Sequence, residues 1–209
     1  MADFHQNGVI STLHNLSNRS LDEIEQELRE YSKDAPIELI LPSLYSELEG
    51  AALKNIVSCL SNVKYLNHII IGLDKADKSE FIKAKKFFSN LNQPHSVIWN
   101  DSPKMKKLDC DFKKLGIAPN QAGKGKNVWY CMGYTYSRNE AGSVALHDCD
   151  ITTYNRELLA RLVYPVSNPH FNYEFCKGYY PRIREGTLSG RVTRPVSYTH
   201  LTLPTTAYV

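Results

Sequence analysis

The stretch IELILPSLYSELEGAALKNIVSCLSNVKYLNHIIIGLD, residues 37–74, contains the strand–helix–strand pattern from which the fold follows. Ile37 to Leu41 is a short apolar run, typical of a strand buried on both faces. Pro42 is expected to end that strand, and Glu47 to Leu60 has apolar residues at helical spacing. His68 to Leu73 is a second buried strand. Two such strands joined by a helix predict a parallel pair.

The same alternation continues along the chain. The expected elements are a helix at Lys78 to Leu91, a strand at Ser96 to Trp99, a polar Lys-rich segment at Asn100 to Ala122, a helix from Lys124 to about Tyr136, a strand at Ser143 to His147, a helix at Asn155 to Val163 and a strand of mixed polarity at Phe171 to Tyr180. Strands alternating with helices predict an α/β fold with a mostly parallel sheet and helices on both faces.

One helix is expected ahead of the sheet. Ser20 caps it, Glu23 completes the capping box, and Leu21, Ile24 and Leu28 recur at helical spacing. This helix is expected to pack and not to catalyse. The predicted organisation is an N-terminal helical extension at residues 1–36, a main domain at 37–194 and a tail at 195–209.

Composition excludes several classes of protein. The 209 residues are 42% hydrophobic, with no apolar run as long as a membrane span and no secretory signal pattern at the start. Five cysteines form an odd, scattered set, which favours reduced thiols and a cytoplasmic location. A net charge of +3 is too small to indicate nucleic-acid binding, so the Lys-rich stretch from Lys104 to Lys114 is interpreted as a solvated loop or helix face.

Asp148-Cys149-Asp150 is the sharpest chemical signal. In open parallel sheets ligands bind at the carboxyl ends of strands, and these two carboxylates directly follow the strand at Ser143 to His147. Two carboxylates, with phosphate oxygens and water, can hold a hard divalent cation. A second copy, Asp109-Cys110-Asp111, follows no strand, and local ion pairing with neighbouring lysines explains it without a metal.

Gly123-Lys124-Gly125 precedes a predicted helix. Backbone amides at a helix start and a Lys ammonium suit a phosphate or diphosphate, although an ordinary glycine turn is the alternative. The motif is not a Walker P-loop, because Gly125 stands where Ser or Thr is required.

Two further strand ends carry polar residues. The turn from Pro42 to Glu47, with Ser43, Leu44 and Tyr45, could frame a base and ribose, or Ser46 could simply cap a helix. Asp74 and Asp77 are open to the same two interpretations. His147 is expected to be a packed histidine at a strand end and not a ligand.

In order along residues 37–194, these motifs resemble the glucosyl-3-phosphoglycerate synthase family of GT-A glycosyltransferases. Pro42 to Glu47 is similar to the family's Pro-Ala-Leu-Asn-Glu-Glu motif, Gly123-Lys124-Gly125 to its Gly-Lys-Gly motif, Asp148-Cys149-Asp150 to its Asp-Ala-Asp metal motif, Phe175 to Arg182 to its Lys-Ala-Phe-Tyr-Arg-Arg segment, and Gly190-Arg191-Val192-Thr193 to the Gly-Arg-Val-Thr of its acceptor site. Tyr45 and Ser46 depart from the first motif. Asp148 to Thr152 is also similar to the related mannosylglycerate synthases.

The resemblance implies a retaining, metal-dependent transfer of a hexose, expected to be glucose, from a UDP- or GDP-sugar to 3-phosphoglycerate. Asp148 and Asp150 would hold Mg²⁺ or Mn²⁺, and Asp150 and Lys124 would stabilise the leaving diphosphate. The implied nucleotide-binding residues are Pro42, Ser43, Leu44, Tyr45, Glu47, Asp74, Gly123, Lys124 and Asp148. The implied acceptor-binding residues are Gly190, Arg191 and Thr193. A homodimer is a further expectation.

The last fifteen residues follow no core or turn logic. Pro195 to Leu203 match, residue for residue, one reading frame of a transposase sequencing adapter. The natural sequence is therefore expected to stop near Arg194, with the rest of the enzyme, including a further metal-binding histidine of the family, missing. The chain would then carry the donor half of a site, and activity from it alone is in doubt.

Two other classes of protein share some of these features. A nucleotidyltransferase also uses carboxylates and Mg²⁺, but it would carry a glycine- and arginine-rich loop after the first strand, where this chain has LPSLYSELEG. A non-catalytic nucleotide-binding module would need no cation, so metal dependence separates it from the enzyme.

Overall fold

The computed structural model describes residues 10–11, 19–119, 121–178, 183–184 and 187–188. The chain forms two compact units, one of residues Ser17–Asn172 and one of Met1–Leu16 with Tyr173–Val209. The larger unit contains the sheet and its helices. The predicted acceptor residues Gly190, Arg191 and Thr193, and the tail at 195–209, lie outside the described residues.

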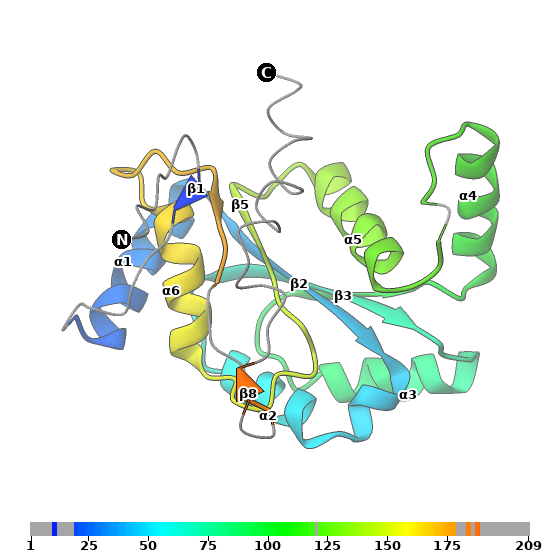
Figure 1. Cartoon of the computed structure of the whole chain (residues 1–209), viewed down its shortest axis with the longest axis horizontal. Helices are drawn as coiled ribbons and strands as arrows, with labels where there is room; N and C mark the ends of the chain where they lie inside the picture. Colours follow the sequence, from blue (N-terminus) through cyan, green and yellow to red (C-terminus); the bar gives the residue numbers. More distant parts are fainter. Residues whose placement is uncertain (1–9, 12–18, 120, 179–182, 185–186, 189–209) are drawn as a thin grey trace. The chain divides into compact units, whose positions relative to one another are not determined.

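Four parallel strands form the centre of the larger unit (Figure 1). They are β2 (Ile37–Leu44), β3 (Leu66–Asp74), β4 (His95–Trp99) and β5 (Ser143–Leu146), in the order β4-β3-β2-β5. All three neighbouring pairs are parallel. The α/β class and the parallel sheet predicted from the sequence are confirmed.

Pro42 lies inside β2, so the prediction that it ends the strand is wrong. β5 pairs with β2 only as far as Ile40 opposite Leu146, and the amide of His147 donates the last bond to the carbonyl of Ile40 at 3.1 Å. Alternate residues of a strand direct their backbone groups to opposite neighbours. Pro42 therefore faces the β5 side beyond the end of that pairing, where its missing N–H removes no ladder bond. The strand continues to Leu44 against β3.

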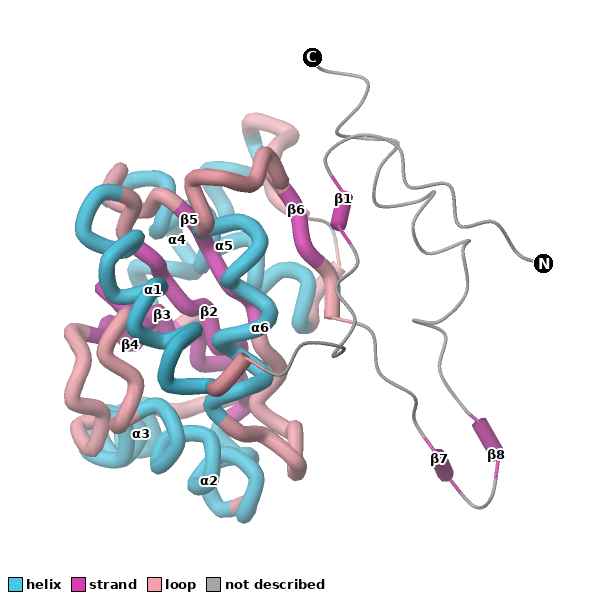
Figure 2. Tube along the Cα trace, turned by 90° about the vertical axis from the view of Figure 1, so that its left-hand side faces the viewer, coloured by secondary structure: helices cyan, strands magenta, loops and turns pink. Residues whose placement is uncertain are grey.

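Helices cover both faces of the sheet, and the alternation of side chains decides which helix meets which face. Ile37, Leu39 and Leu41 of β2 belong to the large core. This core also contains residues of α1 (Leu21–Asp34), α2 (Ala51–Leu60), α3 (Lys78–Phe88) and α6 (Arg156–Ser167). Ile40 and Ile70 point the other way and pack with Cys131 of α5 (Lys124–Arg138). Figures 1 and 2 show the strands as the layer between these helices.

Local capping signals hold where they were expected. Ser20 and Glu23 form the predicted capping box, and Asp77 accepts a hydrogen bond from the amide of Glu80 at 2.8 Å as the cap of α3. The helix predicted at Glu47 to Leu60 is instead two elements, a 3-10 helix η1 (Tyr45–Glu49) and α2, separated by Gly50 in extended conformation. The predicted polar segment contains one helix, α4 (Pro103–Lys114).

In the smaller unit, β1 (Ile10–Ser11) pairs in parallel with β6 (Phe175–Cys176), as Figure 2 shows. β7 (Ile183–Arg184) pairs with β8 (Thr187–Leu188) in antiparallel orientation. The strand predicted at Phe171 to Tyr180 is correct only at Phe175–Cys176 among the described residues. All five cysteines are free thiols, as expected. Among the described residues, no helix is long and apolar enough to span a bilayer.

Candidate active site

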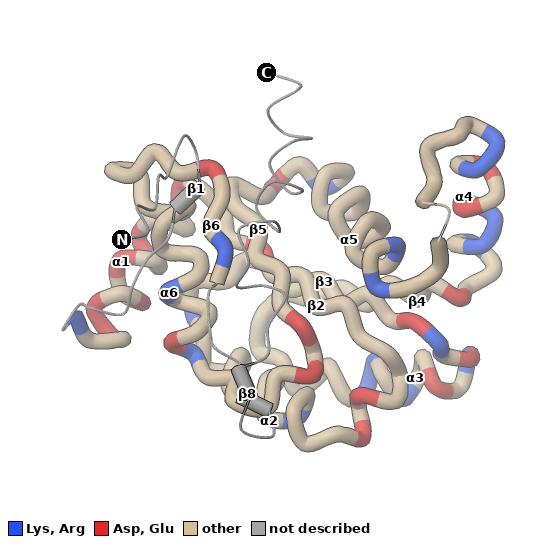
Figure 3. The backbone as a smooth tube through the Cα atoms, in the orientation of Figure 1, with Lys and Arg blue, Asp and Glu red and all other residues tan. Residues whose placement is uncertain are grey.

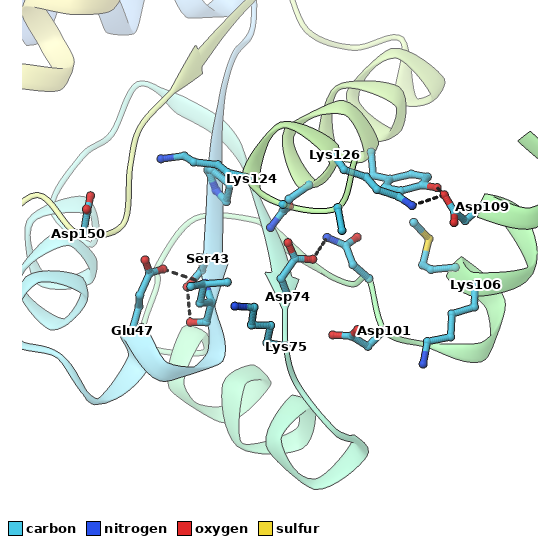
Figure 4. A pocket seen from close by; sticks show the side chains of 18 residues that line it. Ser43, Glu47, Asp74, Lys75, Asp101, Lys106, Asp109, Lys124, Lys126 and Asp150 are labelled. Carbon is cyan, nitrogen blue, oxygen red and sulfur yellow. Dashed lines mark hydrogen bonds and ion pairs between the residues drawn. The ribbon is translucent and has the colours of Figure 1, made fainter. Parts of the chain in front are cut away.

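A cleft of about 570 Å³ lies at the carboxyl ends of β2, β3 and β4, beside the start of α5 (Figure 4). Carboxylates, lysines and amides line it together with apolar side chains. The lining residues are Pro42, Ser43, Leu44, Glu47, Asp74, Lys75, Asn100, Asp101, Met105, Lys106, Asp109, Ala122, Gly123, Lys124, Lys126, Asn127, Tyr130 and Asp150. The place agrees with the rule that ligands of parallel sheets bind at this edge.

The turn after β2 is held by its own glutamate. The amide of Leu44 donates to the Glu47 carboxylate at 2.8 Å, and the hydroxyl of Ser43 donates to the carbonyl of Leu44 at 3.1 Å. Ser43 is buried, so this turn is a fixed wall. Tyr45 does not line the cleft, because its half-buried ring packs against the large core. The structure therefore does not support Tyr45 as a nucleotide-binding residue.

The turns after β3 and β4 hold each other. Asn100 donates to the Asp74 carboxylate at 2.7 Å, and the amide of Ala76 donates to Asp101 at 3.1 Å. Lys75 between them has φ 55°, in the left-handed region that costs a non-glycine residue about 1–3 kcal/mol. Burial raises the pKa of Asp74, while the hydrogen bond from Asn100 acts in the opposite direction. This end of the cleft is thus a preformed polar surface.

Gly72 of β3 lets α5 approach the sheet closely. A Cβ at Gly72 would lie 1.7 Å from Oδ1 of Asn127 and 2.6 Å from Sγ of Cys131. The buried Asn127 amide donates to the carbonyl of Gly72 at 2.8 Å. The start of α5 is therefore fixed directly over the end of β3.

The N-terminus of α5 faces the cleft, and the residue before it, Gly123, has a backbone conformation that favours glycine. Gly123 has φ 135°, and it gives the helix no side-chain cap. Uncapped amides at a helix start, with the positive end of the helix dipole, form an anion-binding place. Lys124 adds an ammonium there and forms an ion pair with Asp148, which follows β5. The two motifs that the sequence singled out for phosphate and metal thus meet in space.

Asp148 and Asp150 have the donor chemistry for a hard divalent ion. Asp150 is exposed and lines the cleft, and the Asp148 side chain is 41% exposed and already next to a cation, Lys124. Among the described residues, no group of three or more His, Cys, Asp or Glu side chains could hold a metal by itself. Mg²⁺ in phosphate-binding sites commonly takes only one or two protein carboxylates and completes its shell with phosphate oxygens and water. The residues therefore fit a metal that binds together with a phosphate ligand.

The residues between and before these carboxylates are structural. Cys149 is buried in the large core, and burial raises the pKa of its thiol well above the usual range. His147 is also buried, with Nδ1 3.1 Å from the hydroxyl of Tyr154. The interpretation of His147 as a packed histidine is confirmed.

The second Asp-Cys-Asp copy is more than surface ion pairing. Asp111 pairs with Lys114 of its own helix at 3.4 Å, as expected. Asp109, however, lines the cleft and binds Lys126 and Tyr130 of α5 at 2.5 and 2.6 Å. The sequence could not show this, because it depends on how α4 packs against α5.

Most of the predicted donor-site residues come together at one cleft. The predicted residues that line it are Pro42, Ser43, Leu44, Glu47, Asp74, Gly123, Lys124 and Asp150. Asp148 joins them through Lys124. Sequence reasoning missed Asn100 and Asp101, although they directly follow a predicted strand and the strand-end rule would have found them. Asn127 and Tyr130 gave no such signal.

The sequence comparisons agree with this geometry. A glucosyl-3-phosphoglycerate synthase of Persephonella marina is 49% identical over 201 residues, which cover 96% of this chain and 49% of that protein. The chain is a relative of the glucosyl-3-phosphoglycerate synthases. A second one, of Methanococcoides burtonii, is 35% identical over 195 residues, or 92% of this chain and 47% of that protein. The chain thus spans about half the length of the curated synthases it matches.

No protein-family model matches the chain. A crystal structure of glucosyl-3-phosphoglycerate synthase from Mycobacterium tuberculosis, in complex with Mn²⁺, UDP and glucosyl-3-phosphoglycerate, superposes with a TM-score of 0.48 and 16% identity. The superposition covers 77% of this chain and 48% of that one. A TM-score of that size does not transfer site positions from one chain to the other.

Proposed function

We propose that this chain forms the donor-binding half of a metal-dependent glucosyltransferase that uses UDP- or GDP-glucose and 3-phosphoglycerate. The observation that carries the proposal is the meeting of Lys124, at the uncapped start of α5, with Asp148 at the end of β5. The two synthases that resemble this chain support the reaction. The acceptor end depends on residues outside those that the structure describes.

The chemical difficulty of this transfer is the departure of a nucleoside diphosphate. A divalent cation held by Asp148 and Asp150 would neutralise the charge that grows on the leaving group. Lys124 and the amides at the start of α5 would bind the same diphosphate, and they need no reorganisation because Gly123 and Asn127 hold the helix start in place.

The nucleoside would occupy the rest of the cleft. Glu47 and the backbone of Ser43 and Leu44 form one wall, and Asp74 with Asn100 forms the floor at the end of β3. Carboxylate and amide oxygens in fixed positions can accept hydrogen bonds from ribose hydroxyls and from base N–H groups. Such contacts would orient the donor with its diphosphate toward Lys124.

Titration calorimetry tests the proposal on the 209-residue chain with UDP-glucose and GDP-glucose, each with Mn²⁺ and with EDTA. Binding of at least one nucleotide sugar is expected with Mn²⁺ and is expected to disappear in EDTA. Equal binding under both conditions would favour the non-catalytic nucleotide-binding module. No binding with Mn²⁺ would remove the donor-site assignment.

A further inference from the structure

Helix α4 forms the side of the cleft farthest from Asp150 (Figure 4). None of the residues Pro103–Lys114, all of which the structure describes, is buried. Most of the charged residues of α4 are lysines (Figure 3), and these lysines are exposed. Since none of its side chains is buried, the position of α4 depends on a few side-chain contacts with α5.

Asp109 makes the strongest of these contacts. Its Oδ1 lies 2.5 Å from Nζ of Lys126 and accepts a hydrogen bond of 2.6 Å from Tyr130, and its Oδ2 lies 2.9 Å from Nζ of Lys113. The Asp109 side chain is only 16% exposed. Phe112 adds an edge-on contact with the ring of Trp129, with centroids 5.6 Å apart. One carboxylate therefore joins α4 to the first two turns of α5.

The same contacts determine what faces the cleft. Met105 and Lys106 line it from the turn of α4 that precedes Asp109. Figure 4 shows Asp109, Lys126 and Lys106 on the side away from Asp150, with Lys124 between the two sides. Lys126 is thereby held by a carboxylate on the α4 side, while Lys124 is held by Asp148 on the metal side.

We propose that Asp109 is a positioning residue for donor binding. It fixes α4 as the wall of the nucleoside end of the cleft and keeps the Lys126 ammonium away from the diphosphate. The inference rests on the proposed function, which places the diphosphate at Lys124 and leaves the α4 side of the cleft for the nucleoside. Because no residue of Pro103–Lys114 is buried, the contacts of Asp109 with α5, together with the Phe112–Trp129 ring contact, hold this wall in place.

The test compares UDP with inorganic pyrophosphate, both with Mn²⁺, on the 209-residue chain. Asp109→Asn should weaken UDP binding by about tenfold or more, since it removes the charge-assisted contact with Lys126 that holds α4 in place. It should not weaken pyrophosphate binding, because pyrophosphate lacks the nucleoside that the wall contacts. Loss of overall structure would weaken both probes, so the difference between them is the informative readout.

Two further variants sharpen the result. Asp111→Asn, in the same Asp-Cys-Asp copy but paired only within α4, should leave both affinities unchanged. Tyr130→Phe removes one bond to Asp109 and should weaken UDP binding by less than Asp109→Asn does. The inference is wrong if Asp109→Asn leaves UDP binding unchanged, weakens both probes alike, or behaves like Asp111→Asn. Failure of the unaltered chain to bind UDP would instead overturn the proposed function together with this inference.

Discussion

Lys124, the first residue of α5, forms an ion pair with Asp148, which follows β5. The two side chains are 52% and 41% exposed. An ion pair this exposed contributes about 0–1 kcal/mol to stability, so it can be exchanged at little cost. A diphosphate could take Lys124 while a metal takes Asp148, which couples the binding of the two ligands.

Replacing Lys124 tests this exchange. Lys124→Met should leave Mn²⁺ binding in the absence of nucleotide as tight as before or tighter, because Asp148 loses its competing cation. UDP binding in the presence of Mn²⁺ should weaken by about tenfold or more, since a charge-assisted contact to phosphate is lost. Electron paramagnetic resonance of free Mn²⁺ measures the first quantity and calorimetry the second. Lys33→Met, which removes an ion pair of α1 with Glu30, is the matched control and should change neither.

The metal assignment distinguishes the two Asp-Cys-Asp copies. Asp150→Ala should abolish Mn²⁺-dependent binding of the nucleotide sugar, because Asp150 lines the cleft at the metal end. Asp111→Ala should not, since Asp111 pairs with Lys114 on the solvated side of α4. Equal effects of the two substitutions on calorimetric affinity would contradict the assignment.

The close approach of α5 to the sheet predicts a stability effect. Gly72→Ala should lower the free energy of unfolding by at least about 2 kcal/mol, because its Cβ must displace Asn127 and break a buried hydrogen bond. Gly133→Ala is the control. Gly133 lies in α5, and a Cβ added there would meet no atom within 4 Å. Alanine at that exposed helical position should instead stabilise by about 0.5–1 kcal/mol. Urea denaturation compares the two.

Asp109 also predicts a pH dependence of stability. Lys126 first, and then Tyr130 and Lys113, hold the pKa of Asp109 well below its usual range. A carboxyl whose pKa is lower in the folded state contributes stability that is fully present above its unfolded pKa, about 3.9, and is lost as pH falls toward the folded value. Asp109→Asn should therefore reduce stability at pH 6 and flatten its decline below about pH 4. Urea denaturation at each pH measures the free energy of unfolding. If this free energy falls as steeply in the variant as in the unaltered chain, other groups cause the decline.

Arg191 is predicted to read the phosphate of the acceptor, and it lies outside the described residues. The test uses a chimera that joins this chain to the second half of the Persephonella marina relative. In it, Arg191→Ala should weaken the binding of 3-phosphoglycerate by about ten- to a hundredfold. The binding of unphosphorylated glycerate should weaken much less. Arg161→Ala, which removes a surface pair with Glu157, is the control for both acceptors. Equal weakening of both acceptors by Arg191→Ala would favour a mannosylglycerate-type acceptor.

Several features could be predicted because their causes are local. The buried runs at Ile37 and His68 predicted parallel strands, since an apolar run of that length needs cover on both faces. The capping box of Ser20 and Glu23 needs only residues three apart. The strand-end rule placed Glu47, Asp74 and Asp150 at one edge of the sheet before any contact was known.

Other features depend on which elements lie next to each other, and the sequence alone could not supply them. Pro42 stays in β2 because β5 stops pairing two residues earlier, which is a property of a strand a hundred residues away. Asp109 enters the cleft only because α4 lies against α5, where Tyr130 and Lys126 meet its carboxylate. The sequence thus determined which segments become helices and strands, and at which edge of the sheet the site lies, through short-range patterns of burial and hydrogen bonding. Tertiary packing decided which charges share that edge, because ion pairs and buried amides form between elements whose distance in space no local pattern records.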